Sequence, residues 1–494
     1  MGGYKLKNYL LGIDIGTSAC KVAVFDILGR VVAQATEEYK VYYPQQDFVE
    51  QNPMEWWESV CIATKKVLLT IDPNDIAGVG VDGQSWSAIP VDKNGSVLHN
   101  AMIWMDRRSG KQAQQIIDKI GNDKIFNLCG NPLDATYTTP KILWLKENKP
   151  KVYKNTYKFL QCNSYITYML TGEMTQDISQ GYGLHFFDMK SGTWNGSMAD
   201  EMGIDIAKMP NIYNCHDIVG TITKKAHEEC GLAIGTPVVA GGLDAACGTL
   251  GAGVVNVGQT QEQGGQAGGM SICEDSPIAD KSLILSYHVI PSLWLLQGGT
   301  VGGGSFKWLR SILGDIDFKD MDNEGENVDA GSDGLIFLPY MAGERSPIWD
   351  KDAKGIYYGL GYDKTRAHMI RATLEGCAFA LQHNLKTAEV AGVNVGELLA
   401  MGGAANSRLW TQIKSDVTGK VIKVPSSDTA TTLGAAILAG VGTGAYKDFN
   451  QAVDSTIKVT RTHEPNMQNH EKYKHSYETY LEIYEKLKDT FRRG

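Results

Sequence analysis

Two aspartates in this chain stand where functional carboxylates are common, at the ends of apolar runs. Asp14 lies near the end of YLLGIDI and is followed by Gly-Thr-Ser, and Asp244 ends VVAGGLD before a stretch of small residues. An ionised aspartate beside a hydroxyl can accept its proton while the oxygen attacks phosphorus. An aspartate near phosphates can hold hydrated Mg²⁺. The pattern therefore indicates phosphoryl transfer, with a turn-forming role for Asp14 and a helix cap for Asp244 as simpler alternatives.

Four glycine-rich loops also follow apolar strands, and their letters are DIGTS, GGQAGG, TVGGGS and MGGAAN. Glycine lets the main chain approach a ligand closely, and N–H groups in such turns can surround phosphate oxygens. One such loop is commonly an ordinary turn, but four of them beside acids favour a nucleotide site. The GxxxxGK[ST] pattern is absent, and the first loop joins two strands where GxGxxG would join a strand to a helix. This arrangement fits a nucleotide held between two lobes, each with a hairpin.

The composition is that of a globular protein with more than one domain. The chain has 494 residues, 43% of them hydrophobic, and a formal net charge of −9. This length exceeds one ordinary core, and no basic block exists to neutralise nucleic-acid phosphates. No apolar run reaches the length of a membrane span, about 18 residues, and the N-terminus lacks the features of a secretory signal. Nine scattered cysteines without CxxC spacing indicate reduced thiols, so we expect a cytoplasmic protein that acts on a small molecule, with no nucleic-acid or membrane partner.

Strand and helix patterns alternate in both halves of the chain. Residues 9–35 predict three strands joined by two turns, and a helix and a further strand follow. Such alternation is typical of an α/β fold with mainly parallel sheets, here with a weak twofold repetition. The glycine-rich stretch 251–259 is the predicted crossing between an N-terminal domain, 1–254, and a C-terminal domain, 255–494.

These ordered motifs resemble those of the carbohydrate kinases named after a Phe-Gly-Gly-Tyr motif, most closely the xylulokinase-like members. The resemblance covers nearly the whole chain. It implies two actin-like, ribonuclease H-like domains with the active site in the cleft between them, ATP and Mg²⁺ as cofactors, and phosphorylation of a sugar hydroxyl. The motifs are GIDIGTSACKVAVFD (12–26), AMIWMDRRS (101–109), TPKILWLKEN (139–148), GGLDAACGTLGAG (241–253), GIYYGLGYDKTRAHMIRATLEG (355–376), GGAANSRLWTQIKSDVTG (402–419) and TATTLGAAILAG (429–440).

The resemblance also assigns roles to individual residues. It makes Asp14 the acid on the metal side and Asp244 the general base. It suggests a homodimer, although no residue pattern requires one. The residues expected to contact the sugar are Gln84, Ser85, Trp86, Trp104, Asp106 and Asp244. The residues expected to contact the nucleotide are Thr17, Ser18, Gly265, Gln266, Gly303, Gly402, Gly403 and Asn406.

Three departures from the family pattern bear on the substrate and the phosphate loop. Ser-Trp-Ser (85–87) stands where xylulokinases usually have Met-His-Gly, and Ala245 stands where they usually have Asn. The second phosphate hairpin contains GQAG (265–268) in place of Gly-Thr-Ser/Gly-Gly, and the polar run QTQEQ (259–263) before it has no explained counterpart. The leading expectation is phosphorylation of D-xylulose to D-xylulose 5-phosphate. The alternatives are another ketose or a polyol (ribulose, a deoxy-ketose, glycerol) or, from another class, a non-kinase actin-like ATPase.

Overall fold

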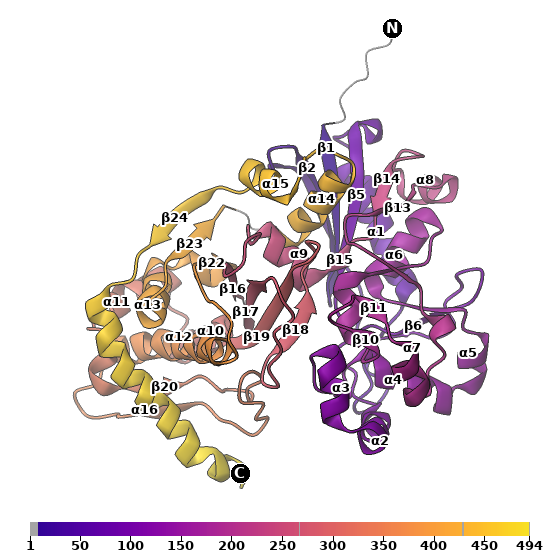
Figure 1. Cartoon of the computed structure of the whole chain (residues 1–494). Helices are drawn as coiled ribbons and strands as arrows, with labels where there is room; N and C mark the ends of the chain where they lie inside the picture. Colours follow the sequence, from indigo (N-terminus) through magenta and orange to yellow (C-terminus); the bar gives the residue numbers. More distant parts are fainter. Residues whose placement is uncertain (1–7, 266, 427–428, 494) are drawn as a thin grey trace.

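The computed structural model describes residues 8–265, 267–426 and 429–493, and each half contains one large sheet (Figure 1). The first sheet runs, in spatial order, through β13 (Ile218–Thr221), β14 (Pro237–Val239), β5 (Ile76–Gly83), β1 (Tyr9–Ile15), β2 (Ala19–Asp26) and β3 (Val31–Glu38), with β15 (Gly242–Leu243) also paired to β5. The second runs through β18 (Ile284–Tyr287), β19 (Trp294–Val301), β17 (Ala267–Glu274), β16 (Thr260–Gly264), β22 (Leu398–Met401), β23 (Ile422–Pro425) and β24 (Val459–His463).

The two sheets repeat one strand order. In the first sheet, β3, β2 and β1 are antiparallel neighbours, and β5 and β14 continue parallel to β1. In the second, β19, β17 and β16 are antiparallel neighbours, and β22 and β23 continue parallel to β16. The predicted α/β class and its twofold repetition are therefore confirmed, although the parallel part of each sheet is only half of it.

Helices pack around both sheets. In the first domain, Asn52 caps α1 by accepting from the Met54 N–H, and the helix buries Trp56 and Val60 against the first sheet. The helices of the first half are α1 (Pro53–Val67), α2 (Gly110–Ile120), α3 (Asn122–Cys129), α4 (Thr138–Asn148), α5 (Pro150–Asn155), α6 (Cys162–Thr171), α7 (Gly196–Met202), α8 (Lys224–Cys230) and α9 (Asp244–Gly251). Those of the second half are α10 (Gly303–Ile312), α11 (Phe318–Glu326), α12 (Arg366–Val390), α13 (Arg408–Thr418), α14 (Ala430–Gly442), α15 (Phe449–Thr456) and α16 (Met467–Phe491).

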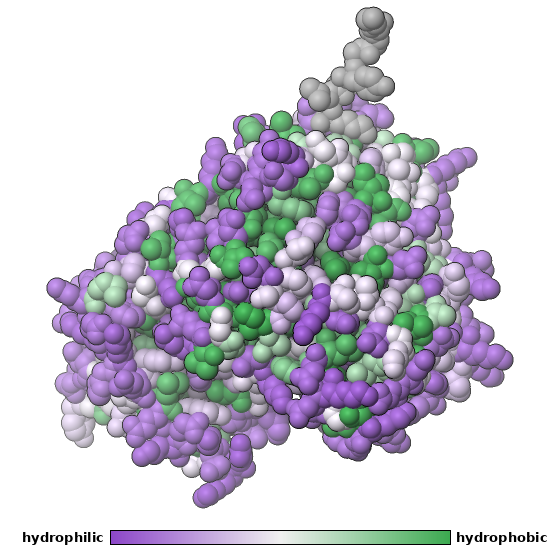
Figure 2. All heavy atoms as spheres, in the orientation of Figure 1, coloured by the Kyte–Doolittle hydropathy of each residue, from purple (hydrophilic) through white to green (hydrophobic). Residues whose placement is uncertain are grey.

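Short strand pairs lie outside the large sheets and support the loops between helices. They are β4 (Glu50–Gln51) with β7 (Ala101–Met102), β6 (Ile89–Val91) with β8 (Lys158–Leu160), β9 (Thr175–Asp177) with β12 (Asn211–Tyr213), β10 (Phe187–Asp188) with β11 (Thr193–Trp194), and β20 (Ile336–Leu338) with β21 (Ile356–Tyr358). Among the described residues no helix is both long and apolar enough to cross a bilayer. The face of the molecule in Figure 2 is mainly hydrophilic, with hydrophobic side chains scattered over it.

Helices α9 and α14 join the two halves. They pack against each other, and α14, which comes late in the chain, lies on β1 and β5 of the first sheet (Figure 1). The contact is close because glycines face it: a Cβ on Gly12 or Gly80 would lie 2.0 Å from a carbonyl oxygen of α14. The division into domains 1–254 and 255–494 stays a prediction, to which the structure adds that a helix of the second half covers the first sheet.

The substitution Gly80→Ala is therefore expected to destabilise the fold. Its Cβ would lie 2.0 Å from the Ala435 carbonyl oxygen, so β5 and α14 must separate. Overpacking of this kind costs on the order of 1–3 kcal/mol, which thermal unfolding would record as a lower Tm. Gly110→Ala is the matched control, because no atom lies within 4 Å of a Cβ at Gly110. A Gly80→Ala protein with the Tm of the control would contradict this packing.

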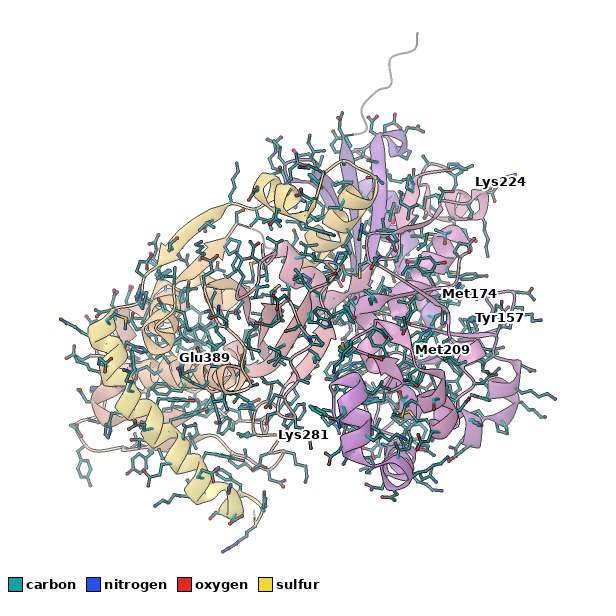
Figure 3. The ribbon with its side chains drawn as sticks, viewed as in Figure 1. Tyr157, Met174, Met209, Lys224, Lys281 and Glu389 are labelled. Atoms are coloured by element: carbon teal, nitrogen blue, oxygen red, sulfur yellow. The ribbon has the colours of Figure 1, made fainter. Side chains whose placement is uncertain are left out.

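A second contact between the halves involves the loop after α3 and the edge strand β18. The Asn131 side chain donates to the Leu285 carbonyl at 2.8 Å and accepts the Leu285 N–H at 3.0 Å, and this pair is buried. Nearby, Lys281 (Figure 3) pairs with Asp123 of α3 at 2.7 Å. The side chains of Lys281 and Asp123 are exposed, so their ion pair contributes little to stability. The buried hydrogen bonds of Asn131 are the stronger link between the halves.

Candidate active site

Three aspartates meet at one end of the first sheet. Asp14 on β1 and Asp82 on β5 are partners in the parallel register, and Gly242 on β15 pairs with Asp82 from the other side. Asp244 follows two residues later and is the first residue of α9. Ligands of open α/β sheets bind beyond the carboxyl ends of their strands, which is where these side chains lie. Sequence reasoning singled out two of the three and missed Asp82.

Burial raises the pKa of all three carboxylates, and repulsion between the acids raises it further at Asp82 and Asp244. Asp82 is fully buried, no described N–H group donates to its oxygens, and its carboxyl shares a hydrogen bond with that of Asp14. Burial, then the charges of Asp14 and Asp244, raise the pKa of Asp82 well above its usual range. Burial also raises the pKa of Asp14, and burial followed by the charge of Asp14 raises the pKa of Asp244 to about 7. Asp14 and Asp244 remain partly exposed, so a ligand can reach them.

The main chain before Asp244 is held by buried hydrogen bonds. The Leu243 N–H donates to Ser179 Oγ at 2.9 Å, and that hydroxyl donates to Asp177 at 2.6 Å. Leu243 is the N-cap of α9, and no side-chain capping bond forms there. Oδ1 of Asp244 accepts from the adjacent Ala245 N–H at 2.6 Å. Leu243 and not Asp244 is therefore the N-cap, but Asp244 still accepts from one free N–H in the first turn of α9, and its side chain remains partly exposed.

The turn between β1 and β2 connects to residues expected on the sugar side. Thr17 Oγ1 accepts from Trp104 Nε1 at 3.0 Å. Gln84 Nε2 lies 3.4 Å from the Gly16 carbonyl and donates to Gln51 Oε1 at 2.8 Å. The hydroxyl hydrogen of Thr17 stays available to a phosphate oxygen, and Ser18, the next residue of the turn, is exposed. The predicted phosphate turn and two predicted sugar contacts thus form one hydrogen-bonded group.

Three glycine loops of the second half converge. The Gly303 N–H donates to the Gly265 carbonyl at 2.6 Å. A Cβ on Gly302 would lie 2.6 Å from that same oxygen, and one on Gly402 would lie 2.8 Å from the Gly264 carbonyl. Gly402 also has φ 80°, a conformation that favours glycine. Glycine is required in these loops because the backbone of one loop touches that of the next.

Beyond this junction the backbone faces free space. No atom of the described residues lies within 4 Å of a Cβ built on Gly403, and Asn406 is exposed close by. This leaves room for a nucleotide against the loops. Gln266, the departure noted in the second phosphate hairpin, lies outside the described residues.

The unexplained polar run 259–263 forms β16, a central strand of the second sheet. Glu262 and Lys414 of α13 make a buried ion pair at 2.6 Å, and the ammonium lies 4.6 Å from the ring centroid of Trp410. Gln261 accepts from Thr249 of α9 at 2.9 Å. Glu262 and Gln261 therefore have partners on two helices, whereas Thr260 Oγ1 and Glu262 Oε2 have none among the described residues. The bond of Gln261 links the second sheet to the helix that begins at Asp244.

An aromatic group lines the sugar side. The ring of Trp86 lies 4.2 Å from that of Tyr137 and 5.8 Å from that of Tyr182, centroid to centroid, and the Tyr182 hydroxyl faces Ser85. Trp86 has φ 59°, which is rare for a bulky residue. Its Nε1 is buried beside the Tyr182 hydroxyl and makes no hydrogen bond of good geometry among the described residues. A buried donor with so weak a partner can turn to a ligand atom, so Trp86 fits the predicted pocket wall.

Gln84 and Asp106 differ in whether their side chains keep a polar atom without a hydrogen-bond partner. Gln84 is buried, and its Oε1 has no partner among the described residues. Asp106 is fully buried too, but its carboxylate accepts from the Val49 N–H at 2.7 Å and from the Arg108 guanidinium at 2.7 Å. This geometry argues against the sugar contact expected of Asp106. The Asp106 side chain instead holds the loop that carries Trp104.

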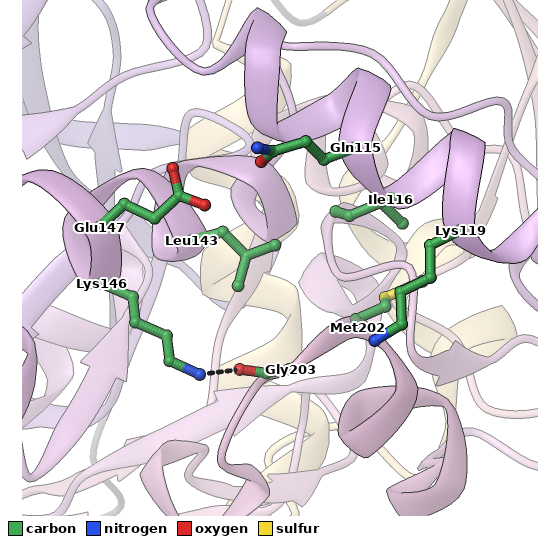
Figure 4. Close-up of a pocket in the computed structure, with 8 residues that line it drawn as sticks. All are labelled: Gln115, Ile116, Lys119, Leu143, Lys146, Glu147, Met202 and Gly203. Atoms are coloured by element: carbon green, nitrogen blue, oxygen red, sulfur yellow. Dashed lines mark hydrogen bonds between the residues drawn. The ribbon is translucent and has the colours of Figure 1, made fainter.

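A surface pocket of about 400 Å³ lies elsewhere on the first domain, among α2, α4 and α7 (Figure 4). Its floor contains Ile116, Leu143 and Met202. The ammonium of Lys146 donates to the Gly203 carbonyl at 2.6 Å across the pocket. None of its lining residues belongs to the groups described above, so this pocket adds nothing to the candidate site.

A duplicated sheet with glycine turns on its hairpins, and a partly exposed aspartate at the start of the helix that packs on α14, is the architecture of an actin-like phosphotransferase. Residues 9–251 match the model of the N-terminal domain of the FGGY family of carbohydrate kinases, and residues 269–443 match that of its C-terminal domain. The chain belongs to this family and is an ATP-dependent carbohydrate kinase.

Individual relatives agree with this placement. A xylulose kinase of Staphylococcus epidermidis is 32% identical over 490 residues, 98% of each chain. A gluconokinase of Bacillus subtilis is 28% identical over 474 residues, 93% of this chain and 92% of the relative. The crystal structure of xylulose kinase from Rhodospirillum rubrum superposes with a TM-score of 0.91 at 26% identity and covers 98% of this chain and 100% of the other. The family is thus shown, while its relatives act on different sugars.

Proposed function

We propose that the kinase phosphorylates an uncharged ketopentose, with D-xylulose to D-xylulose 5-phosphate as the first candidate. Relatives named xylulose kinase support a ketopentose, whereas a relative named gluconokinase would favour a sugar acid. The observation that supports a neutral sugar is the charge of the site, where Asp244 lies near Asp14 and Asp82 and the cations Arg108 and Lys141 are already engaged. The departures at 85–87 and Ala245 keep another ketose or a polyol as the second candidate.

Among the described cations near the sugar-side loops, Arg108 and Lys141 already have partners, and Lys21 lies opposite Asp14 in the register of β1 and β2, on the metal side. Arg108 pairs with Asp106 at 2.7 Å and with Glu50 at 2.8 Å. Lys141 donates to two main-chain carbonyls. Arg107 lies 3.7 Å from Asp134, but both side chains are exposed, so this ion pair is weak. A bound carboxylate would face Asp244 without a counter-charge, which costs free energy in a buried place. An aldonate is therefore a poor acceptor here and a neutral sugar a good one.

Asp244 is the proposed base. Its carboxylate accepts the proton of the attacking hydroxyl as the new O–P bond forms and the bond to the ADP oxygen breaks. Trp86 and Gln84 offer a donor and an acceptor to the other sugar hydroxyls. Thr17, Ser18 and the turn around Gly265 hold phosphate oxygens.

The residues present also fit Mg²⁺. Carboxylates are ligands that magnesium prefers, and it usually keeps several waters and binds through substrate phosphates. Asp14 is partly exposed at the phosphate turn, and the carboxyl of Asp82, to which no described N–H group donates, shares a hydrogen bond with it. Across the described residues, no group of three or more His, Cys, Asp or Glu side chains could hold a metal ion by itself. We therefore place Mg²⁺ on the Asp14 side, where it would neutralise phosphate charge.

A panel of acceptors tests the proposal. ADP release is measured by a coupled assay with ATP, Mg²⁺ and each of D-xylulose, D-ribulose, a deoxy-ketose, glycerol and D-gluconate. We expect a neutral ketopentose to have the highest kcat/KM and gluconate to give no rate above background. A preference for gluconate would contradict the argument from charge, and equal background rates with all acceptors would contradict the sugar kinase itself. The cytoplasmic location and the homodimer stay predictions.

Removing the Trp86 ring is expected to weaken acceptor binding. Trp86→Ala deletes the indole that packs on Tyr137 and the buried Nε1 donor. Loss of the ring contact and one hydrogen bond amounts to about 1.5–3 kcal/mol, or roughly tenfold to a hundredfold in KM for the sugar. The KM for ATP should stay within twofold. Trp194→Ala, a partly buried tryptophan on β11, is the control, and equal effects of the two substitutions would contradict the role of Trp86.

A further inference from the structure

A fully buried lysine lies behind the sugar-side loops. Lys141 on α4 is 0% exposed, and its Nζ donates to the Trp86 carbonyl at 2.9 Å and to the Ile103 carbonyl at 2.7 Å. It makes no ion pair with any residue that the structure describes. Burial lowers its pKa to about 7, with the charge of Asp106 acting in the opposite direction. An ammonium buried without a carboxylate is costly, so its place in the fold needs a reason.

The two carbonyls belong to the two loops that carry the sugar-side tryptophans. Trp86 holds its strained φ of 59° while its own carbonyl accepts from Lys141. Ile103 directly precedes Trp104, whose indole donates to Thr17 in the phosphate turn. Residues in sparsely populated backbone conformations persist only where their surroundings enforce them. One ammonium therefore ties both loops to α4 and fixes the separation of their indoles.

The same helix supports the first of these loops a second time. Thr138, in the first turn of α4, donates to the Ser87 carbonyl at 3.3 Å, a longer contact than either bond of Lys141. Apart from Lys141, no described donor reaches the Trp86 carbonyl. Without the lysine this buried carbonyl would be unpaired, and the loop would gain by relaxing away from its strained conformation.

We infer that Lys141 is a positioning residue of the acceptor site, which sets the places of Trp86 and Trp104 through their main chains. It touches neither the sugar nor the nucleotide, and it acts only through the two loops. This inference rests on the proposed sugar site and adds to it the residue that holds the two tryptophan loops in place. A lysine that only stabilised the fold would lower stability and leave the balance between the two substrates unchanged.

The substitution Lys141→Met tests the inference, because methionine keeps most of the volume and removes the donors. With the acceptor that the parent protein prefers, we expect the KM for the sugar to rise at least tenfold and the KM for ATP to stay within twofold. Lys146→Met is the matched control: Lys146 lies on the same helix and also donates to a carbonyl, that of Gly203, but at the surface (Figure 4). The control should leave both KM values unchanged.

A double-mutant cycle with Trp86→Ala shows whether Lys141 acts through Trp86. If it does, Lys141→Met raises the sugar KM much less in the Trp86→Ala background than in the parent, because coupled sites are not additive. Equal rises in the KM for sugar and ATP, or full additivity in the cycle, would overturn the inference. If Lys141→Met does not fold, Lys141→Gln, which retains one donor group, replaces it. This variant should show a smaller rise in the KM for the sugar with the KM for ATP unchanged, and the absence of that rise would equally overturn the inference.

Activity measurements on the unsubstituted protein distinguish failure of this inference from failure of the proposed function. If the parent phosphorylates no acceptor, the proposed function fails, and the positioning role is then read from acrylamide quenching of tryptophan fluorescence. Lys141→Met should increase quenching by exposing Trp86, and Lys146→Met should not. Quenching equal to that of the parent would overturn the inference by this second route.

Discussion

Asp244→Ala is expected to lower the rate of phosphoryl transfer by about 10²–10⁴-fold, the usual contribution of a general base. The substitution removes the partly exposed carboxylate at the start of α9 and leaves Leu243 and its buried hydrogen bonds in place. The loops around Gly265 and Gly402 that are expected to hold the nucleotide are untouched. Calorimetry should therefore give an ATP affinity close to that of the parent, while the coupled assay gives almost no ADP.

Asp118→Ala provides the control for that experiment. Asp118 is an exposed residue of α2 whose carboxylate accepts from Gln114 on the same helix. Its removal should leave kcat and ATP affinity unchanged. An Asp244→Ala protein with a kcat near that of this control would refute the role of Asp244 as the base.

Asp82→Asn is expected to stabilise the protein in the absence of nucleotide. Burial and the neighbouring acids raise the pKa of Asp82, so the folded state holds a proton that the unfolded state releases above about pH 4. Stability then falls as the pH rises above that value. Asparagine removes the charge, so we expect a gain of about 1–3 kcal/mol at pH 8 and no difference near pH 4, measured by denaturant unfolding.

Asp244 contributes to the same pH dependence in the parent protein. Its pKa of about 7 against about 4 in the unfolded chain predicts a loss of stability from pH 4 to pH 7, with an upper bound of about 4 kcal/mol. Asp26→Asn is the control, with an expected change in stability of opposite sign to that of Asp82→Asn. Hydrogen bonds from the Arg30 and Leu28 N–H groups favour the charged form of Asp26, so its removal should destabilise the protein above pH 4. An Asp82→Asn protein less stable than the parent at pH 8 would contradict the description of this acid cluster.

The parts of the site that could be predicted from the sequence are those with a local signal. Asp14 and Asp244 each end an apolar run, and the glycine loops are visible as letters, because a close backbone approach permits no other residue. The alternation of strands and helices predicted the fold class in the same way. The presence of two sheets with the same strand order agrees with the weak repetition expected from the sequence.

The remaining parts depend on contacts between distant segments. Tyr137 and Tyr182 meet Trp86 only after folding, and neither stands in a pattern of its own. Asp82 carried the same signal as Asp14, a charge near the end of a buried strand, and could have been found by it. Asp106 was expected at the sugar because its segment resembles a family motif, but its ion pair with Arg108 is visible only in three dimensions.

The polar strand β16 breaks the usual pattern of a buried strand. A central strand is normally apolar on both faces, and the letters TQEQG predict a loop or an edge more readily. Its Glu262 is stabilised by Lys414, a residue 152 positions away. No local pattern reports such a partner, so this strand could be placed only by the structure.

The most direct test of the central claim is ³¹P NMR of ATP with the purified protein, Mg²⁺ and D-xylulose. The account predicts that the γ-phosphate signal of ATP is replaced in equal amounts by those of ADP and of a sugar phosphomonoester, and that neither appears without the sugar. Formation of ADP and inorganic phosphate without a phosphomonoester, at a rate independent of any sugar acceptor, would contradict it and would favour an actin-like ATPase.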